Sequence, residues 1–228
     1  MTTHDTVNAS AERSRIPTLS PRTRGLLIAG AAAGPLFYLS AIAQMATREG
    51  FDLRVHPISQ LSTGEWGWIQ VLAFVLAGAG LICLALGHRA AVTDGIGRTA
   101  IPLLLVAAGL GFIAAGVFPQ NPSHGFPVGT PTGPATATSW HALIHMVAAI
   151  AAFTAIAIAA VVALVRSIRE RRALPTIGHA VVALALLAPV VPEFASIQVA
   201  VTGLFAFGWC TAVAVRLLRT LHTRRADR

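Results

Sequence analysis

Long apolar runs separated by short polar links dominate the pattern of this chain. Six runs can be drawn, at about residues 26–46, 66–87, 99–118, 139–165, 175–191 and 194–215. Most approach the roughly 20 residues that an α-helix needs to cross a ~30 Å hydrocarbon core. Pro189, Pro192 and Glu193 interrupt the last apolar stretch and indicate a tight hairpin between the fifth run, which is short, and the sixth. The pattern predicts an all-α membrane protein, a bundle of six transmembrane helices over residues 25–217.

The two ends of the chain differ from this body. Residues 1–24 are polar, contain four arginines and show no apolar period, so we expect a disordered tail. Residues 218–228 form a second, basic tail. Ala41-Ile42-Ala43 resembles the cleavage site of a signal peptide, which is the alternative interpretation of the first run. A polar leader of this length before the apolar part favours an uncleaved first helix.

Composition supports a membrane location. The chain is 55% hydrophobic and 11% charged, and its mean hydropathy is +0.69, whereas a soluble domain carries about 25% charged residues. The net charge of +8 belongs to arginines placed between apolar runs. We therefore expect the lipid bilayer, and not nucleic acid, to be the partner of these charges. Cys83 and Cys210 both lie inside apolar runs and predict no disulfide framework.

The arginines also predict the orientation. Fifteen of the 17 lie in the two tails and in the links near residues 88–98 and 166–172, whereas the alternate links contain only Arg48 and Arg54. Because basic residues accumulate in cytoplasmic links, both termini are expected in the cytoplasm, and the protein is expected to be a multi-pass protein of a bacterial plasma membrane. Four of the eight histidines, at positions 4, 88, 179 and 222, fall on the cytoplasmic side, and we expect them to form no cluster.

The outer face then contains the residues best suited to chemistry. His141 and His145 open the fourth run four residues apart, which places both on one face of a helix. This spacing occurs in metal sites, and a catalytic zinc takes about three protein ligands and leaves one position open for water. His56, or His124 in its place, would supply the third ligand. The sequence thus predicts a candidate zinc site.

Two further residues complete this hypothesis. Asp52 would orient a ligand or act as a general base, and Ser59 would bind substrate or hold a water molecule. The alternative is structural: His141 and His145 would hydrogen-bond to the Pro- and Gly-rich link at 119–138. The segment HPISQLS at 56–62 is equally good turn and cap chemistry before a helix. Both interpretations remain open at this stage.

Three motifs carry a family resemblance: HPISQLS at 56–62, FPQNP at 118–122 and HALIHMVAA at 141–149. In this order they resemble the prokaryotic integral-membrane family catalogued as domain of unknown function nine-nine-eight. The resemblance implies a six-helix plasma-membrane protein and no known activity. A more distant similarity is to the alkaline ceramidases and progestin/adiponectin-type receptors, seven-span proteins that hold zinc with three histidines. It implies that His141 and His145 form the ligand pair, that His56 is the other ligand, and that Ser59 is the site serine.

Two functions follow from these residues. The first is a metal-assisted hydrolase that acts on a lipid-like or amphipathic substrate at the outer leaflet, with zinc activating a water molecule. The second is a non-enzymatic protein, either a small-solute binder or transporter or a partner-binding scaffold, in which the polar cluster only closes the outer end of the bundle.

Reporter fusions test the orientation. A periplasm-active reporter joined at Gly129 is expected to be active, and one joined at Glu170 is expected to be silent, because the arginine count places these links on opposite sides of the membrane. A cytoplasm-active reporter should give the reverse result. A cytoplasmic signal from position 129 would overturn the orientation.

Overall fold

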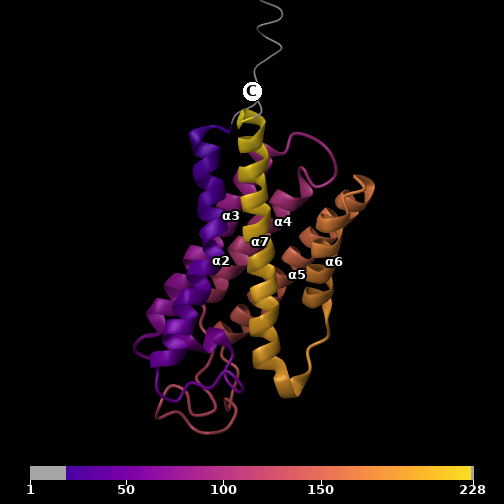
Figure 1. Ribbon diagram of the computed structural model, residues 1–228. Helices are drawn as coiled ribbons and strands as arrows, with labels where there is room; N and C mark the ends of the chain where they lie inside the picture. Colours follow the sequence, from indigo (N-terminus) through magenta and orange to yellow (C-terminus); the bar gives the residue numbers. More distant parts are fainter. Residues whose placement is uncertain (1–18, 227–228) are drawn as a thin grey trace, which may run out of the picture.

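Helices that run side by side build the computed structural model, which describes residues 19–226, with side chains as far as Arg219 (Figure 1). Every regular element in the described part is helical. In chain order these are α2 (Pro21–Thr47), the 3-10 turn η1 (Ile58–Ser62), α3 (Gly67–Ala91), α4 (Ala100–Val117), α5 (Trp140–Arg169), α6 (Ala173–Leu187), the 3-10 turn η2 (Pro192–Phe194) and α7 (Ala195–Ala226). The predicted all-α class is confirmed.

The helix ends differ from the expected spans mainly at the two termini. α2 begins at Pro21, because the Ser20 hydroxyl accepts the N–H of Thr23 (3.1 Å) and caps the first turn. Residues 21–24, expected in the tail, are therefore helical. α7 likewise continues to Ala226, through most of the expected C-terminal tail. The predicted disorder of residues 1–18 lies outside the described residues, as do residues 227 and 228.

Five helices, α2, α3, α4, α5 and α7, are long and apolar enough to cross a membrane. α6 is apolar but has only 15 residues. At 1.5 Å per residue it is about 22 Å long, shorter than a ~30 Å hydrocarbon core. The chain therefore has the composition of a multi-pass membrane protein, with α6 as its short member.

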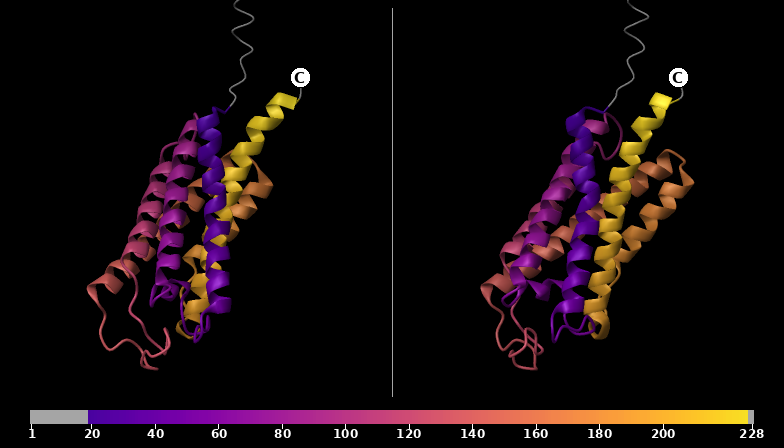
Figure 2. Two further views of the ribbon diagram at one scale, coloured as in Figure 1. Left: turned by 90° about the vertical axis from the view of Figure 1, so that its left-hand side faces the viewer. Right: turned by 60° about the vertical axis from the view of Figure 1, so that its left-hand side comes forward.

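The bundle has two different ends (Figures 1 and 2). The links 48–66, 118–139 and 188–194 gather at one end, which we call the loop end. The start of α2, the links 92–99 and 170–172 and the end of α7 lie at the other, which we call the terminal end. The residues singled out from the sequence, from His56 to His145, lie at or near the loop end.

Small residues set the spacing of the helices. α3 packs between α2 and α4, α4 packs against α5, and α7 packs against α2. A Cβ atom added to Gly109 of α4 would lie 2.6 Å from the carbonyl oxygen of Gly78 in α3, so the two backbones are in direct contact. Close approach through small residues is typical of helices that pack together in membranes. Phe37, Phe74, Phe112 and Phe207 fill the centre with ring centroids 4.9 to 6.3 Å apart.

The seam between α6 and α7 is the exception to this packing. α6 contacts α5 along its length, but it meets α7 over far fewer residues than other neighbouring helices meet each other. Val182 and Ala183 are its only buried residues. The views in Figure 2 show α6 diverging from α7 at the terminal end. This end of the bundle is consequently the less filled one.

Replacing Gly78 or Gly109 by alanine should lower the melting temperature of the purified protein in detergent. The added methyl group meets backbone, and overpacking costs about 1–3 kcal/mol, partly offset by the roughly 1 kcal/mol gain in helix propensity. Gly25→Ala is the matched control, because a Cβ there meets nothing within 4 Å. Equal melting temperatures for all three variants would contradict the close approach.

Candidate functional site

His56 joins two links at the loop end. Its ring is buried, with 3% of the side chain exposed. The N–H of Asp52 donates to Nδ1 (2.9 Å), and Nε2 donates to the carbonyl oxygen of His124 (3.0 Å). Both ring nitrogens are therefore engaged by backbone, and Nδ1 presents its lone pair to an N–H and not to a metal. His56 connects the α2–α3 link to the Pro-rich link that follows α4.

His141 and His145 share one side of α5, as their spacing predicts, but have different contacts. His145 is buried, and its Nδ1 donates to the carbonyl oxygens of Ala115 (2.7 Å) and Phe118 (3.1 Å). These carbonyls belong to the end of α4, where no further helical N–H is available to them. His141 is half-buried, and its ring stacks on that of Trp140 at 3.6 Å. His145 thus completes the end of α4.

The other predicted site residues have separate roles. The Asp52 carboxylate binds Arg54 (2.6 Å), which lowers the pKa of Asp52 to about 2, chiefly through hydrogen bonds from the Arg54 side chain and backbone. His124 is exposed, with a left-handed φ of 53°, and contributes its carbonyl oxygen to His56. Ser59 lies half-buried in η1, where its carbonyl oxygen accepts the Ser62 hydroxyl (2.6 Å).

Asp52, His56 and His124 are thus neighbours, but not as ligands of one ion. Within residues 19–219, whose side chains are described, no three His, Cys, Asp or Glu side chains are grouped as a metal site requires. The zinc site therefore stays a prediction from the sequence, and the observed hydrogen bonds give the histidines structural roles.

The Pro-rich link closes the loop end. Phe126, 1% exposed, packs on Phe51 and His56 with centroids 5.3 and 5.4 Å away, and the Arg48 guanidinium lies over its ring at 4.7 Å. Arg48 also donates to the carbonyl oxygen of Thr63 (2.6 Å). The two arginines that depart from the charge pattern, Arg48 and Arg54, are both bound at this end.

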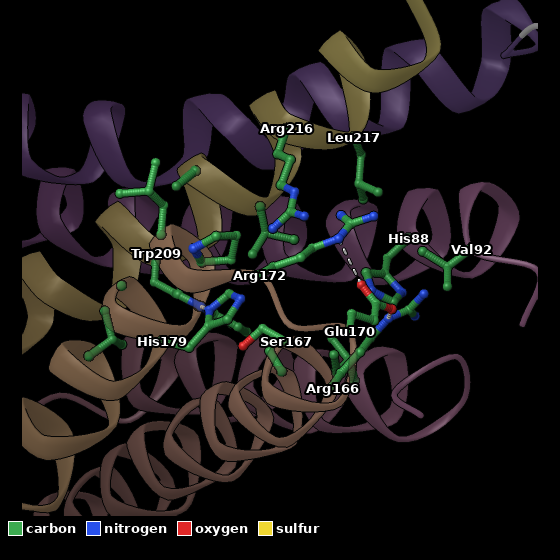
Figure 3. Close-up of a pocket in the computed structure, with 18 of the residues that line it drawn as sticks. His88, Val92, Arg166, Ser167, Glu170, Arg172, His179, Trp209, Arg216 and Leu217 are labelled. Atoms are coloured by element: carbon green, nitrogen blue, oxygen red, sulfur yellow. Dashed lines mark hydrogen bonds and ion pairs between the residues drawn. The ribbon is translucent and has the colours of Figure 1, made fainter. Parts of the chain in front are cut away.

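A cavity of about 1020 Å³ occupies the terminal end (Figure 3). Its walls come from α5, α6 and α7, with the end of α3 and the α3–α4 link closing one side. Charged groups line the part nearest the termini. Glu170 binds Arg166 at 2.7 Å and Arg172 at 3.1 Å, and Arg216 of α7 lines the same region. The pKa of Glu170 is lowered, mainly by the hydrogen bond from Arg166 and further by the positive charges of all three arginines.

The deeper part of the cavity is apolar. Val182 of α6 and Leu204 and Phe205 of α7 line it, and the indole N–H of Trp209 donates to Nδ1 of His179 (2.9 Å) at its wall. Two glycines also line the cavity, Gly178 of α6 and Gly208 of α7. A Cβ added to either would meet nothing within 4 Å. These glycines do not serve close helix packing, since they leave the wall bare.

His88 is the polar group without a partner at this cavity. It lies in the last turn of α3, is 5% exposed and lines the cavity, and its Nδ1 atom has no hydrogen-bond partner among the described residues. Buried ring nitrogens are normally satisfied, and leaving one unpaired costs about 1–3 kcal/mol. Together with the arginines, His88 indicates a site for a polar group that the described part of the chain does not supply.

Sequence reasoning missed this site for a physical reason. His88 and His179 were expected to form no cluster, yet they line one cavity with Arg166, Arg172 and Arg216. From the sequence, the arginines are interpreted as determinants of orientation and as partners of the lipid bilayer. The residues come from four helices, and no local spacing connects them. The signal for the cavity that the sequence does contain is a pair of glycines in the last two apolar runs, Gly178 and Gly208.

His56→Ala is expected to destabilise the protein by about 2–4 kcal/mol, because it removes a buried ring and unpairs two backbone groups. His141→Ala, which loses a half-exposed stacked ring, should cost less than about 1 kcal/mol. Denaturation in detergent measures both, and elemental analysis measures their zinc content. Loss of stoichiometric zinc in both variants would instead support a shared metal site.

Comparison with known families completes the description. The family model described as Protein of unknown function (DUF998) matches residues 31–216, from the first third of α2 to Arg216 in α7. No curated protein and no solved structure gives a match to the chain. The resemblance inferred from the three motifs is confirmed, because the family match includes all of them. The chain therefore belongs to the DUF998 family, whose function is unknown.

Proposed function

We propose that this protein is a multi-pass membrane protein that binds an amphipathic anion in the terminal-end cavity. The observation that carries the proposal is the division of one cavity into an arginine-lined mouth and an apolar interior with bare glycine walls. Pockets of about 300–1,000 Å³ with mainly apolar lining and a few placed polar groups are typical of small-molecule sites. It takes up the binder hypothesis from the sequence, which had no site attached to it, and gives it a site at the terminal end.

The charge of the mouth favours an anion. Three arginines, Glu170 and Asp94 line it, which leaves a net charge of +1 for these five groups. Like charges gathered in one cavity repel each other unless an anion lies among them. Arg166 also donates to the carbonyl oxygens of Asp94 (3.2 Å) and Ile96 (3.3 Å), so it holds the α3–α4 link in place as well.

The interior favours an apolar chain attached to that anion. Leu217 lies at the mouth and Leu204 deep in the cavity, 13 residues apart on α7, or about 20 Å along the helix axis. Half of a ~30 Å hydrocarbon core is about 15 Å. A molecule oriented like a lipid of one leaflet therefore matches the length of the cavity, with its head near the termini.

The same proposal includes the placement of the protein in the membrane. The five long helices span the plasma membrane of a bacterium, the short α6 crosses it where the bilayer thins locally to match its length, and both termini are cytoplasmic. The distribution of the arginines supports this orientation. Arg48 and Arg54, the two arginines at the loop end, are bound by local contacts there, which explains their departure from the charge pattern. The cavity then opens toward the cytoplasmic leaflet.

A metal-assisted hydrolase at the outer leaflet stays the second hypothesis. It would need His56 to give up the hydrogen bond between its Nδ1 atom and the N–H of Asp52. It would also need His145 to bind an ion through Nε2 while its Nδ1 keeps the hydrogen bond to the carbonyl oxygen of Ala115 at the end of α4. No contact at the loop end favours this rearrangement. Zinc analysis of the His56→Ala and His141→Ala variants decides it independently of the cavity.

Filling the cavity tests the proposal. Gly178→Leu and Gly208→Leu place side chains in open space, so both variants should fold and bind an amphipathic anion at least about tenfold more weakly. Native mass spectrometry of the protein titrated with oleate and with oleoyl phosphate measures this binding.

Gly25→Leu is the matched control, because a Cβ at Gly25 also meets nothing within 4 Å but the residue does not line the cavity. Unchanged binding in both cavity variants, with melting temperatures equal to that of the control, would overturn the proposed binding site.

A further inference from the structure

We propose that the anion is a phosphomonoester, presented by a lipid of the leaflet at the terminal end and held by Arg172, Arg216 and His88. This inference rests on the proposed function and adds the chemistry of the head group. Three kinds of observation support it: the convergence of cations from separate helices, the unpaired nitrogen of His88, and the start of α6.

The cations reach the mouth from different directions. Arg172 precedes α6 and Arg216 lies in α7, so their guanidinium groups approach the same region from two helices (Figure 3). Among the described contacts Arg172 uses Nε for Glu170 (3.1 Å), which leaves its two Nη groups for a ligand. Arg166 is already engaged with Glu170 and the α3–α4 link. Arg172 and Arg216 are assigned to the head group because they line the mouth from the start of α6 and from α7, on both sides of the seam where the cavity opens.

His88 supplies an independent indication. Its side chain is more than nine-tenths buried and lines the cavity, and no described residue pairs with its Nδ1 atom. A phosphate oxygen can accept a hydrogen bond from this nitrogen, and the gain is large because the group is otherwise desolvated and unpaired.

The start of α6 adds a third contribution. Its N-cap, Arg172, makes no side-chain capping bond, and its first turn contains no acidic residue. Leu174 and Pro175 of that first turn line the cavity, and of the two only Leu174 has a backbone N–H to donate. Because the N-terminus of a helix carries positive partial charge and free N–H groups, it favours an anion at this position.

A phosphomonoester fits these groups better than a carboxylate does. It carries a charge of about −1.5 to −2 near pH 7 and three terminal oxygens. The three oxygens match donors that converge from α3, the start of α6 and α7, in a mouth whose charged side chains sum to +1. A carboxylate offers two oxygens in one plane and a single charge, which one arginine can satisfy. A zwitterionic lipid would bring a cation against the guanidinium groups.

Quenching of Trp209 provides the experiment, because this residue lies in the cavity wall. The other tryptophans, Trp66, Trp68 and Trp140, are 56%, 59% and 60% exposed at the loop end and can be replaced by phenylalanine. The full chain is placed in nanodiscs of phosphatidylcholine with increasing fractions of dibromostearoyl phosphatidic acid. The same titration is made with dibromostearoyl phosphatidylcholine and with dibromostearic acid, and with soluble glycerol phosphate as competitor.

We expect half-maximal quenching by the phosphatidic acid at a mole fraction at least about tenfold lower than with phosphatidylcholine, and clearly lower than with the fatty acid. Arg172→Gln and Arg216→Gln should each reduce this preference about tenfold or more, which is the usual effect of losing a charged hydrogen bond. Arg169→Gln, a nearby arginine that does not line the cavity, should leave it unchanged.

His88→Leu should lower the preference for phosphate over carboxylate, and His88→Gln, which keeps a donor, should restore part of it. Native mass spectrometry of the unaltered chain should rank the three lipids in the same order.

Equal quenching by phosphatidic acid and the fatty acid would overturn the phosphomonoester and leave the amphipathic anion site standing. No preference for either anion over phosphatidylcholine would overturn the proposed function too, and full displacement by glycerol phosphate would assign the site to soluble phosphate esters.

Discussion

Close contact between helices carries most of this structure. A lipid environment gives apolar helices no hydrophobic reason to associate, so the bundle depends on van der Waals contact between surfaces that can approach closely. α3 supplies that surface on both sides. It meets α4 through Gly78 and Gly109, and it meets α2 through Gly30 and Gly80. A dense group of four helices consequently surrounds the central phenylalanines: α2, α3 and α4, with α7 packed against α2.

The two remaining helices are held differently, and the cavity is the consequence. α5 packs on α4, and α6 packs on α5, but the contact that would close the ring between α6 and α7 is sparse. α6 is too short to match the full length of its neighbours. The glycines at this seam, Gly178 and Gly208, approach no other residue. The seam therefore remains open at the end where the arginines lie.

The polar groups of the two ends show the same contrast. At the loop end His56 and Arg48 satisfy backbone groups of several links, and Phe126 fills the space between them. At the terminal end three arginines line the cavity mouth with Glu170 and Asp94, and no described residue pairs with Nδ1 of His88. Buried unpaired atoms occur toward the loop end too, at Oε1 of Gln44 and Nε2 of Gln70. The contrast between the ends is therefore one of space: a filled end is expected of a structural cap, whereas a hollow end lined by arginines is expected of a binding site.

Much of the fold was predictable from the sequence, because membrane spans and their order depend on local runs of apolar residues and on the count of arginines between them. The spacing of His141 and His145 correctly placed both on one side of α5. Their partners were not predictable, since the carbonyl groups that bind His145 belong to another helix. The cavity was equally hidden. Gly109 and Gly208 look alike in the sequence, and only the packing of neighbouring helices decides that one fills a close contact and the other leaves open space.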